Sequence, residues 1–297
     1  MAMTTKDAAL KWGISDRRVR VLCAEGKIDG VWRDGKIWYI PDATIKPNDG
    51  RFKNSEILMK EISRKKLELD HCDSLTEGEI ERLAREFVVE FTYNSNAIEG
   101  NTLTLKETAL ALEGITVDKK PLKDHLDAVG HRDAFLYAKE VAKETEFISE
   151  QIIKNIHSLV LMNRPEDRGM YRRIPVRILG AYTEPVQPHL IEQKIQDLLE
   201  LNKSRKESMN AIERVALFHL EFEEIHPFID GNGRTGRLVL NLELIQEGYP
   251  PINIKFADRK QYYDAFDSFY RDRDASKMIN LIARYIDKRL DEYLAVF

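Results

Sequence analysis

The stretch from His226 to Arg237 reads His-Pro-Phe-Ile-Asp-Gly-Asn-Gly-Arg-Thr-Gly-Arg. Apolar residues keep helical spacing on both sides of it, from Ile212 to Phe222 and again from Leu238 to Ile245. The pattern predicts a loop that joins two helices and opens the second one. Similar helical spacing recurs through most of the chain, so we expect a mostly α-helical protein.

The loop has the composition of a phosphate-binding site. Gly231 and Gly233 allow the backbone to turn its N–H groups inward without a side-chain clash. The start of the following helix adds unpaired N–H donors and the positive end of the helix dipole. Arg234 and Arg237 lie one turn apart, so both guanidinium groups are predicted to reach successive phosphates from one face.

Two further residues of the stretch suggest chemistry. Asp230 directly precedes the loop and is placed to hold a hard cation such as Mg²⁺, which bridges phosphate oxygens. His226 can accept a proton near neutral pH, because the ordinary pKa of a histidine is about 6.5. Each residue alone is weak evidence, and their combination within one short stretch predicts a nucleotide-phosphate site.

The stretch resembles the signature of Fic domains, His-Pro-Phe-x-Asp/Glu-Gly-Asn-Gly-Arg-x-x-Arg, at every defined position. The resemblance implies transfer of AMP from ATP to a hydroxyl of a target protein. It implies His226 as general base, Asp230 as Mg²⁺ ligand, and Asn232 with the glycine backbone as the cradle for the α- and β-phosphates. Arg234 and Arg237 would then clamp the β- and γ-phosphates.

A second short motif lies at the end of a helix predicted over residues 76–100. Glu99 falls in its last turn, where a negative charge opposes the helix dipole, so a compensating cation is expected. Ser95 to Gly100 resembles the inhibitory motif of Fic proteins, Ser/Thr-x-x-x-Glu-Gly/Asn, which implies that Glu99 pairs with Arg237. An exposed helix end without a role is the alternative. The same carboxylate could instead orient a water that removes AMP from a modified protein.

Two other features are interpreted through the same resemblance. Residues 176–186 break the helical pattern and predict a short β-hairpin, at the position of the flap that registers the target backbone by strand addition. A plain surface hairpin is the alternative. Tyr262 and Tyr263 resemble the tyrosine pair that lines the adenine pocket, with one of the two expected in the core.

Residues 1–45 are predicted to form a small unit of their own, joined by a linker at 46–51 to a Fic domain over 52–297. Helices are expected from residue 4 to 12 and from 15 to 25, followed by a hairpin around Asp34-Gly35. This pattern resembles the winged helix-turn-helix of excisionase and MerR-type proteins. Arg17, Arg18 and Arg20 could contact DNA, although nine Lys/Arg against seven Asp/Glu in residues 1–50 is a thin positive charge. Dimerisation or target docking is the alternative.

The composition limits the remaining classes of function. The chain has 297 residues, 43% hydrophobic and 32% charged, and a net charge of −4, which gives no global basic field for nucleic acid or a membrane. Cys23 and Cys72 are expected to be plain thiols, and without a secretory signal a cytoplasmic location fits. The expected partners are a target protein, which could be the chain itself, and a second copy in a homodimer. A DNA-binding regulator that uses the Fic core as a nucleotide sensor is a competing class, but a sensor would not need the base His226.

Overall fold

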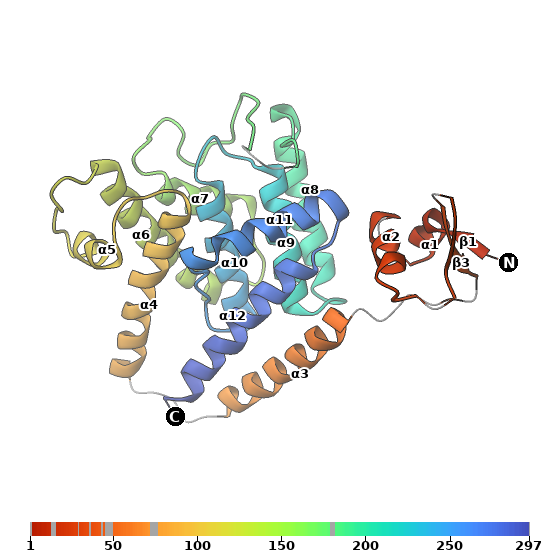
Figure 1. Ribbon diagram of the computed structural model, residues 1–297. Coiled ribbons are helices and arrows are strands. Elements are labelled where there is room, and N and C mark those ends of the chain that lie inside the picture. Colours follow the sequence, from red (N-terminus) through yellow and green to blue (C-terminus); the bar gives the residue numbers. More distant parts are fainter. Residues whose placement is uncertain are drawn as a thin grey trace.

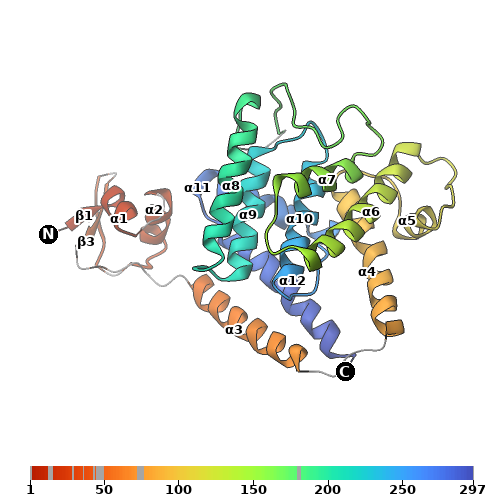
Figure 2. The same cartoon turned by 180° about the vertical axis from the view of Figure 1, so that it is seen from behind.

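The computed structural model describes residues 2–12, 16–28, 30–35, 37–42, 44, 50–71, 77–178 and 182–296. Nearly all of its regular structure is helical, as the sequence predicts, and Figures 1 and 2 show helices surrounding a central helix, α10. This helix runs from Asn232 to Gln246 and is buried along most of its length. It begins inside the signature stretch, so the core of the protein and the predicted site share one element.

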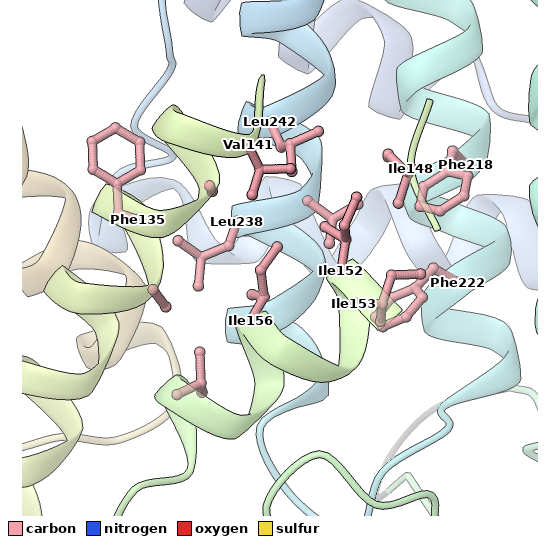
Figure 3. Close-up of a cluster of buried hydrophobic side chains, with 14 of the residues drawn as sticks. Phe135, Val141, Ile148, Ile152, Ile153, Ile156, Phe218, Phe222, Leu238 and Leu242 are labelled. Carbon is pink, nitrogen blue, oxygen red and sulfur yellow. The ribbon is translucent and has the colours of Figure 1, made fainter. Parts of the chain in front are cut away.

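The main hydrophobic cluster is built largely by four helices, with α4 (Glu77–Ile98) and α8 (Ile191–Arg205) packing against them. The four are α6 (Leu122–Glu144), α7 (Glu150–Val160), α9 (Ala211–Ile225) and α10. Figure 3 shows Ile152, Ile153 and Ile156 of α7 directed between Leu238 of α10 and Phe222 of α9. The three isoleucines recur at the spacing of one helix face, and Ser149 caps the helix by accepting a hydrogen bond from the Ile152 N–H at 3.3 Å.

A second cluster packs the helices on the other side of the core. Helix α3 (Gly50–Asp70) lies along α12 (Ser276–Leu294), with Ile62 fully buried between them. Lys65 crosses the same seam, its Nζ 2.7 Å from Asp287 and 2.6 Å from Asp291. The other helices described after residue 50 are α5 (Leu105–Leu112), η1 (Pro188–Leu190), η2 (Phe256–Asp258) and α11 (Arg259–Asp272).

The N-terminal elements form a small sheet with two helices. Strands β2 (Trp32–Asp34) and β3 (Ile37–Pro41) make the predicted hairpin, and helices α1 (Thr5–Trp12) and α2 (Asp16–Ala24) lie within two residues of the predicted bounds. Strand β1 (Ala2–Thr4) adds to β3 and gives the antiparallel order β1-β3-β2. Three residues are too few to show a strand pattern, which is why β1 was not predicted. Ser15 at the predicted start of the second helix, most of the linker, Cys72 and the Arg18 side chain lie outside the described residues.

The predicted hairpin at residues 176–186 is wrong for the part that the structure describes. Residues 174–178 and 182–187 form two arms that carry no strand pairing. Pro175 and Pro185 lack the backbone N–H that a ladder requires. The carbonyls of Ile174 and Val186 accept hydrogen bonds from the buried guanidinium of Arg172 instead of from a partner strand. A side chain thus holds the two arms together.

None of the helices in the described ranges combines the length and the apolar character that crossing a membrane requires.

Candidate active site

His226 ends helix α9 in a left-handed conformation, with φ 50° and ψ 62°. Pro227 follows it and disfavours a helical conformation for the preceding residue, and a left-handed residue other than glycine is strained. Arg172 holds this corner, because its Nε donates to the His226 carbonyl at 2.8 Å and its backbone N–H to the Pro227 carbonyl at 3.0 Å. The guanidinium of Arg172, which joins the two arms at residues 174–178 and 182–187, therefore also fixes the backbone of the predicted base.

The His226 side chain is largely buried, with 23% of it exposed. Its Nδ1 is buried and has no hydrogen-bond partner among the residues that the structure describes. Burial, with a contribution from the charge of Arg172, lowers the pKa of His226 to about 4. The ring is therefore neutral at pH 7, and Nε2 is the nitrogen left to accept a proton.

The glycine loop turns as predicted but is held differently. Gly231 starts α10 with φ 78°, a conformation that glycine adopts readily. The Asn232 side chain accepts from the Phe228 N–H and donates to the Phe228 carbonyl, both at 2.9 Å. The Asn232 amide thus braces the loop, and its part in a phosphate cradle together with the backbone N–H groups stays a prediction.

The guanidinium of Arg234 contacts carboxylates that the sequence spacing did not predict as its partners. It is buried against α6, with NH1 2.8 Å from Asp127 Oδ1, and NH2 lies 3.5 Å from Asp230. Both side chains of the Arg234–Asp127 pair are less than 5% exposed. One turn of helix separates the two arginines, but Arg234 pairs with the buried Asp127 of α6, whereas Arg237 pairs with the partly exposed Glu99 that follows α4.

Arg237 is the second arginine of the signature, and it contacts the end of α4. Its NH2 donates to Glu99 Oε1 and to the Ser95 carbonyl, each at 2.8 Å, and its Nε donates to the Ser95 hydroxyl at 3.0 Å. The Glu99 carboxylate also touches the first turn of α10, since a Cβ on Gly233 would lie 2.3 Å from Glu99 Oε1. Glu99 therefore occupies the place where the helix N-terminus would receive an anion.

These groups surround one cavity of about 470 Å³, a size that suits a nucleotide. The cavity is lined by the groups described above, by both predicted tyrosines and by further residues of α9, α11 and the arm that reaches residue 178. The lining residues are Glu99, Ile178, Glu223, His226, Gly233, Arg237, Tyr262, Tyr263, Phe266, Asp267 and Tyr270. Tyr262 is buried and bonds through its hydroxyl to His219 Nε2 at 2.7 Å. Tyr263 is 47% exposed, so Tyr262 is the member of the pair that belongs to the core.

Asp230 stands at the other side of the glycine loop. Its Oδ1 accepts from the Gly231 N–H at 2.6 Å, and its Oδ2 lies 3.6 Å from Arg164. Burial alone would raise the pKa of Asp230, but Arg234 and the Gly231 N–H lower it overall, so the group is a carboxylate. In the described part of the chain no three His, Cys, Asp or Glu side chains gather as a metal site. This donor set fits a Mg²⁺ that also takes phosphate oxygens as ligands.

Sequence reasoning missed several groups that build the site. His157 is buried and stacks on Phe228 with ring centroids 3.6 Å apart, and its Nε2 lies 3.0 Å from the Asp230 carbonyl. Its position in a helix gave no sign of this role. Sequence reasoning also missed Arg172 and Asp127, because the residues that they contact lie far away in the sequence.

Residues 147–244 match the model of the Fic/DOC family, and this range contains the glycine loop, His226 and both signature arginines. The chain carries a Fic domain.

Relatives of the Fic domain extend the similarity over most of the chain. Protein adenylyltransferase fic-1 of Caenorhabditis elegans is 32% identical over 220 residues, which cover 72% of this chain and 43% of the relative. Protein adenylyltransferase Fic of Nematostella vectensis is 34% identical over 220 residues, 73% of this chain and 51% of the relative. The solved structure of C. elegans Fic-1 superposes with a TM-score of 0.73 at 28% identity, covering 82% of this chain and 73% of that one. The chain thus spans about half the length of these two curated relatives.

Proposed function

We propose that the protein transfers AMP from ATP to a hydroxyl side chain of a target protein. The observation that carries this proposal is the single cavity that joins His226, the first turn of α10 and Arg237. The adenylyltransferase relatives support the same activity. The target is another protein or the chain itself, and ATP is the second substrate.

In the proposed reaction the triphosphate lies over the first turn of α10. Arg237 clamps its terminal phosphates, and Tyr263 with Tyr262 forms the adenine side of the cavity. Asp230 would hold Mg²⁺, which would neutralise charge on the phosphate oxygens when bound. His226 accepts the proton of the target hydroxyl. At the same time the hydroxyl oxygen bonds to the α-phosphorus, and the bond from that phosphorus to the leaving pyrophosphate breaks.

We further propose that Glu99 restrains this reaction. Its carboxylate neutralises Arg237 and touches Gly233, so a γ-phosphate would meet a negative charge in place of a free guanidinium. Burial by itself would lower the pKa of Arg237, but the charge of Glu99, with a contribution from Tyr262, raises it overall. Ser95 keeps the arginine in this orientation.

The test is AMP transfer by the full chain with ATP labelled on the α-phosphate. We expect Glu99→Gly to label itself or a target strongly and the unaltered protein to label weakly. Glu113→Gly is the matched control, because Glu113 ends the neighbouring helix α5 outside the cavity. Adding His226→Ala to Glu99→Gly should abolish labelling while ATP still binds. Equal labelling with and without Glu99 would contradict the restraint, and labelling without His226 would contradict the base.

Removal of AMP from a modified protein is a second candidate, favoured by the position of Glu99 in the same cavity as His226, with 34% of its side chain exposed. There Glu99 would orient the attacking water. The same variant separates the two directions, because Glu99→Gly should gain transfer and lose removal.

For the N-terminal unit, residues 1–45, we propose DNA binding through α2, with target docking as the competing role. Arg17 and Arg20 are exposed on this helix, although Arg20 also pairs with Asp16. Binding of the full chain to duplex DNA should weaken steeply with salt and fall in Arg17→Ala. Binding that ignores both changes would leave docking as the better proposal.

A further inference from the structure

Glu223 is a buried acid in the wall of the cavity that the proposed mechanism does not use. It lies on α9, one turn before His226, and is 7% exposed. Its Oε1 has no hydrogen-bond partner among the described residues. Burial, helped by the charge of Glu99, raises the pKa of Glu223 to about 8 although Arg237 acts in the opposite direction. A carboxyl kept in such a place without a partner calls for a role.

The nearest group of complementary chemistry is the ring of His226. Glu223 Oε2 lies 3.8 Å from His226 Nδ1, and this nitrogen is also buried without a partner. A movement of about 1 Å would bring the two atoms to hydrogen-bond distance. Such contacts are often long in the absence of substrate and shorten in the reactive complex.

The packing around Glu223 confines its carboxyl, and the neighbouring His219 Nδ1, which is also buried, makes no hydrogen bond to it or to any other described residue. A Cβ on Gly236 would lie 2.4 Å from Glu223 Oε1, which is too close for two unbonded atoms. The same Cβ would lie 3.0 Å from the His219 ring. The glycine of α10 therefore makes room for the carboxyl on one side. His219 occupies the next position, and its Nε2 is already engaged by the Tyr262 hydroxyl.

We propose that Glu223 is a positioning residue for His226, with its carboxyl oxygen accepting a hydrogen bond from Nδ1–H so that Nε2 is free to take a proton. The inference rests on the proposed AMP transfer with His226 as its base. Glu223 itself gains and loses no bond in the reaction. With its pKa raised to about 8 the carboxyl is neutral near pH 7, so its carbonyl oxygen is the acceptor. It fixes which ring nitrogen carries hydrogen, but without the negative charge that the acid of a catalytic triad carries.

The competing explanation is that the backbone carbonyl of Glu223, which also raises the pKa of His226, orients the ring alone. Two substitutions separate the explanations. Glu223→Leu keeps about the same volume and removes every acceptor from the side chain. Glu223→Gln keeps an acceptor oxygen. Because leucine replaces a buried polar group that has no partner, the Leu variant is expected to unfold at the same or a higher urea concentration.

The experiment measures AMP transfer in the Glu99→Gly protein with each substitution added. We expect Glu223→Leu to lower kcat about tenfold or more with KM for ATP unchanged, and Glu223→Gln to stay within about threefold. Glu224→Gln is the control, because Glu224 neighbours Glu223 but pairs with Arg273 at 2.8 Å. Equal rates in the Leu variant and its parent, or equal losses in Leu and Gln, would overturn the proposal. Absence of transfer in Glu99→Gly alone would instead overturn the proposed function and this inference with it.

Discussion

At the scale of single residues, the backbone of the site depends on the buried guanidinium of Arg172. Arg172 is 4% exposed, and its guanidinium donates to the backbone carbonyls of His226, Ile174 and Val186. Its guanidinium carries out the role that a β-ladder was expected to play. A cation with this many acceptors is hard to replace, because lysine presents a single charged nitrogen in place of a planar fork.

We therefore expect Arg172→Met to destabilise the protein by about 3 kcal/mol, since several buried carbonyls lose their donor. Arg173→Met is the matched control, as Arg173 is exposed next to it. Urea unfolding of the two variants gives the comparison. Equal midpoints would mean that water replaces the guanidinium without loss.

A second prediction at this scale concerns pH. A histidine accepts a proton only while neutral, so transfer should fall as the pH drops through the pKa of His226. Burial holds that pKa at about 4, and removing Glu99, whose charge raises it, cannot move it upward. In Glu99→Gly we expect kcat/KM to be retained between pH 7 and about pH 5, where an ordinary histidine would already be protonated. Half-loss near pH 6.5 would show that the ring is solvated in the active enzyme.

At the scale of elements, the N-terminus of α10 is tied to α6 by the buried pair of Arg234 and Asp127. Asp127 also accepts from Asn163 at 3.3 Å, so one carboxylate joins the central helix to two other segments. The loop over which a nucleotide would lie is thus rigid before any ligand arrives, which favours anion binding by fixed backbone donors.

Asp127→Ala is expected to lower the free energy of unfolding by about 3 kcal/mol or more, because Arg234 would remain buried without its charge partner. Asp133→Ala on the same helix provides the control, as its pair with Arg132 is partly exposed. The two losses are compared by urea denaturation. Similar small losses would show that Arg234 finds water or Asp230 instead.

At the scale of the whole molecule, two parts have separate hydrophobic cores. The N-terminal sheet and helices share a cluster that includes Val19, Leu22 and Ile40, whereas Ile62 of α3 belongs to the cluster built by α12. A boundary near residue 50 stays a prediction, and the separation of the two clusters is the reason to expect it. Helix α3 belongs with the second part, because Lys65 and Ile62 both contact or pack against α12.

A chain that begins at residue 50 and carries Glu99→Gly should therefore keep its AMP transfer and its urea midpoint. A chain that begins at residue 77 should lose stability, because it exposes the apolar face of α12 and leaves Asp287 without Lys65. Circular dichroism and transfer assays on both chains give the answer. Loss of transfer in the longer chain would show that the N-terminal unit takes part in the reaction.

The sequence by itself determined the helices, the glycine turn and the residues of the signature. These features follow from spacing and backbone conformation within a few residues, as at Gly231 and in α5. The pairing of Glu99 with Arg237 was implied only by resemblance, since 138 positions separate the two residues. Tertiary structure alone decided that Asp127 engages Arg234, that Asn232 braces its own loop and that Arg172 replaces a hairpin. A buried polar group bonds to whatever partner the packing brings within reach, and local sequence does not contain that partner.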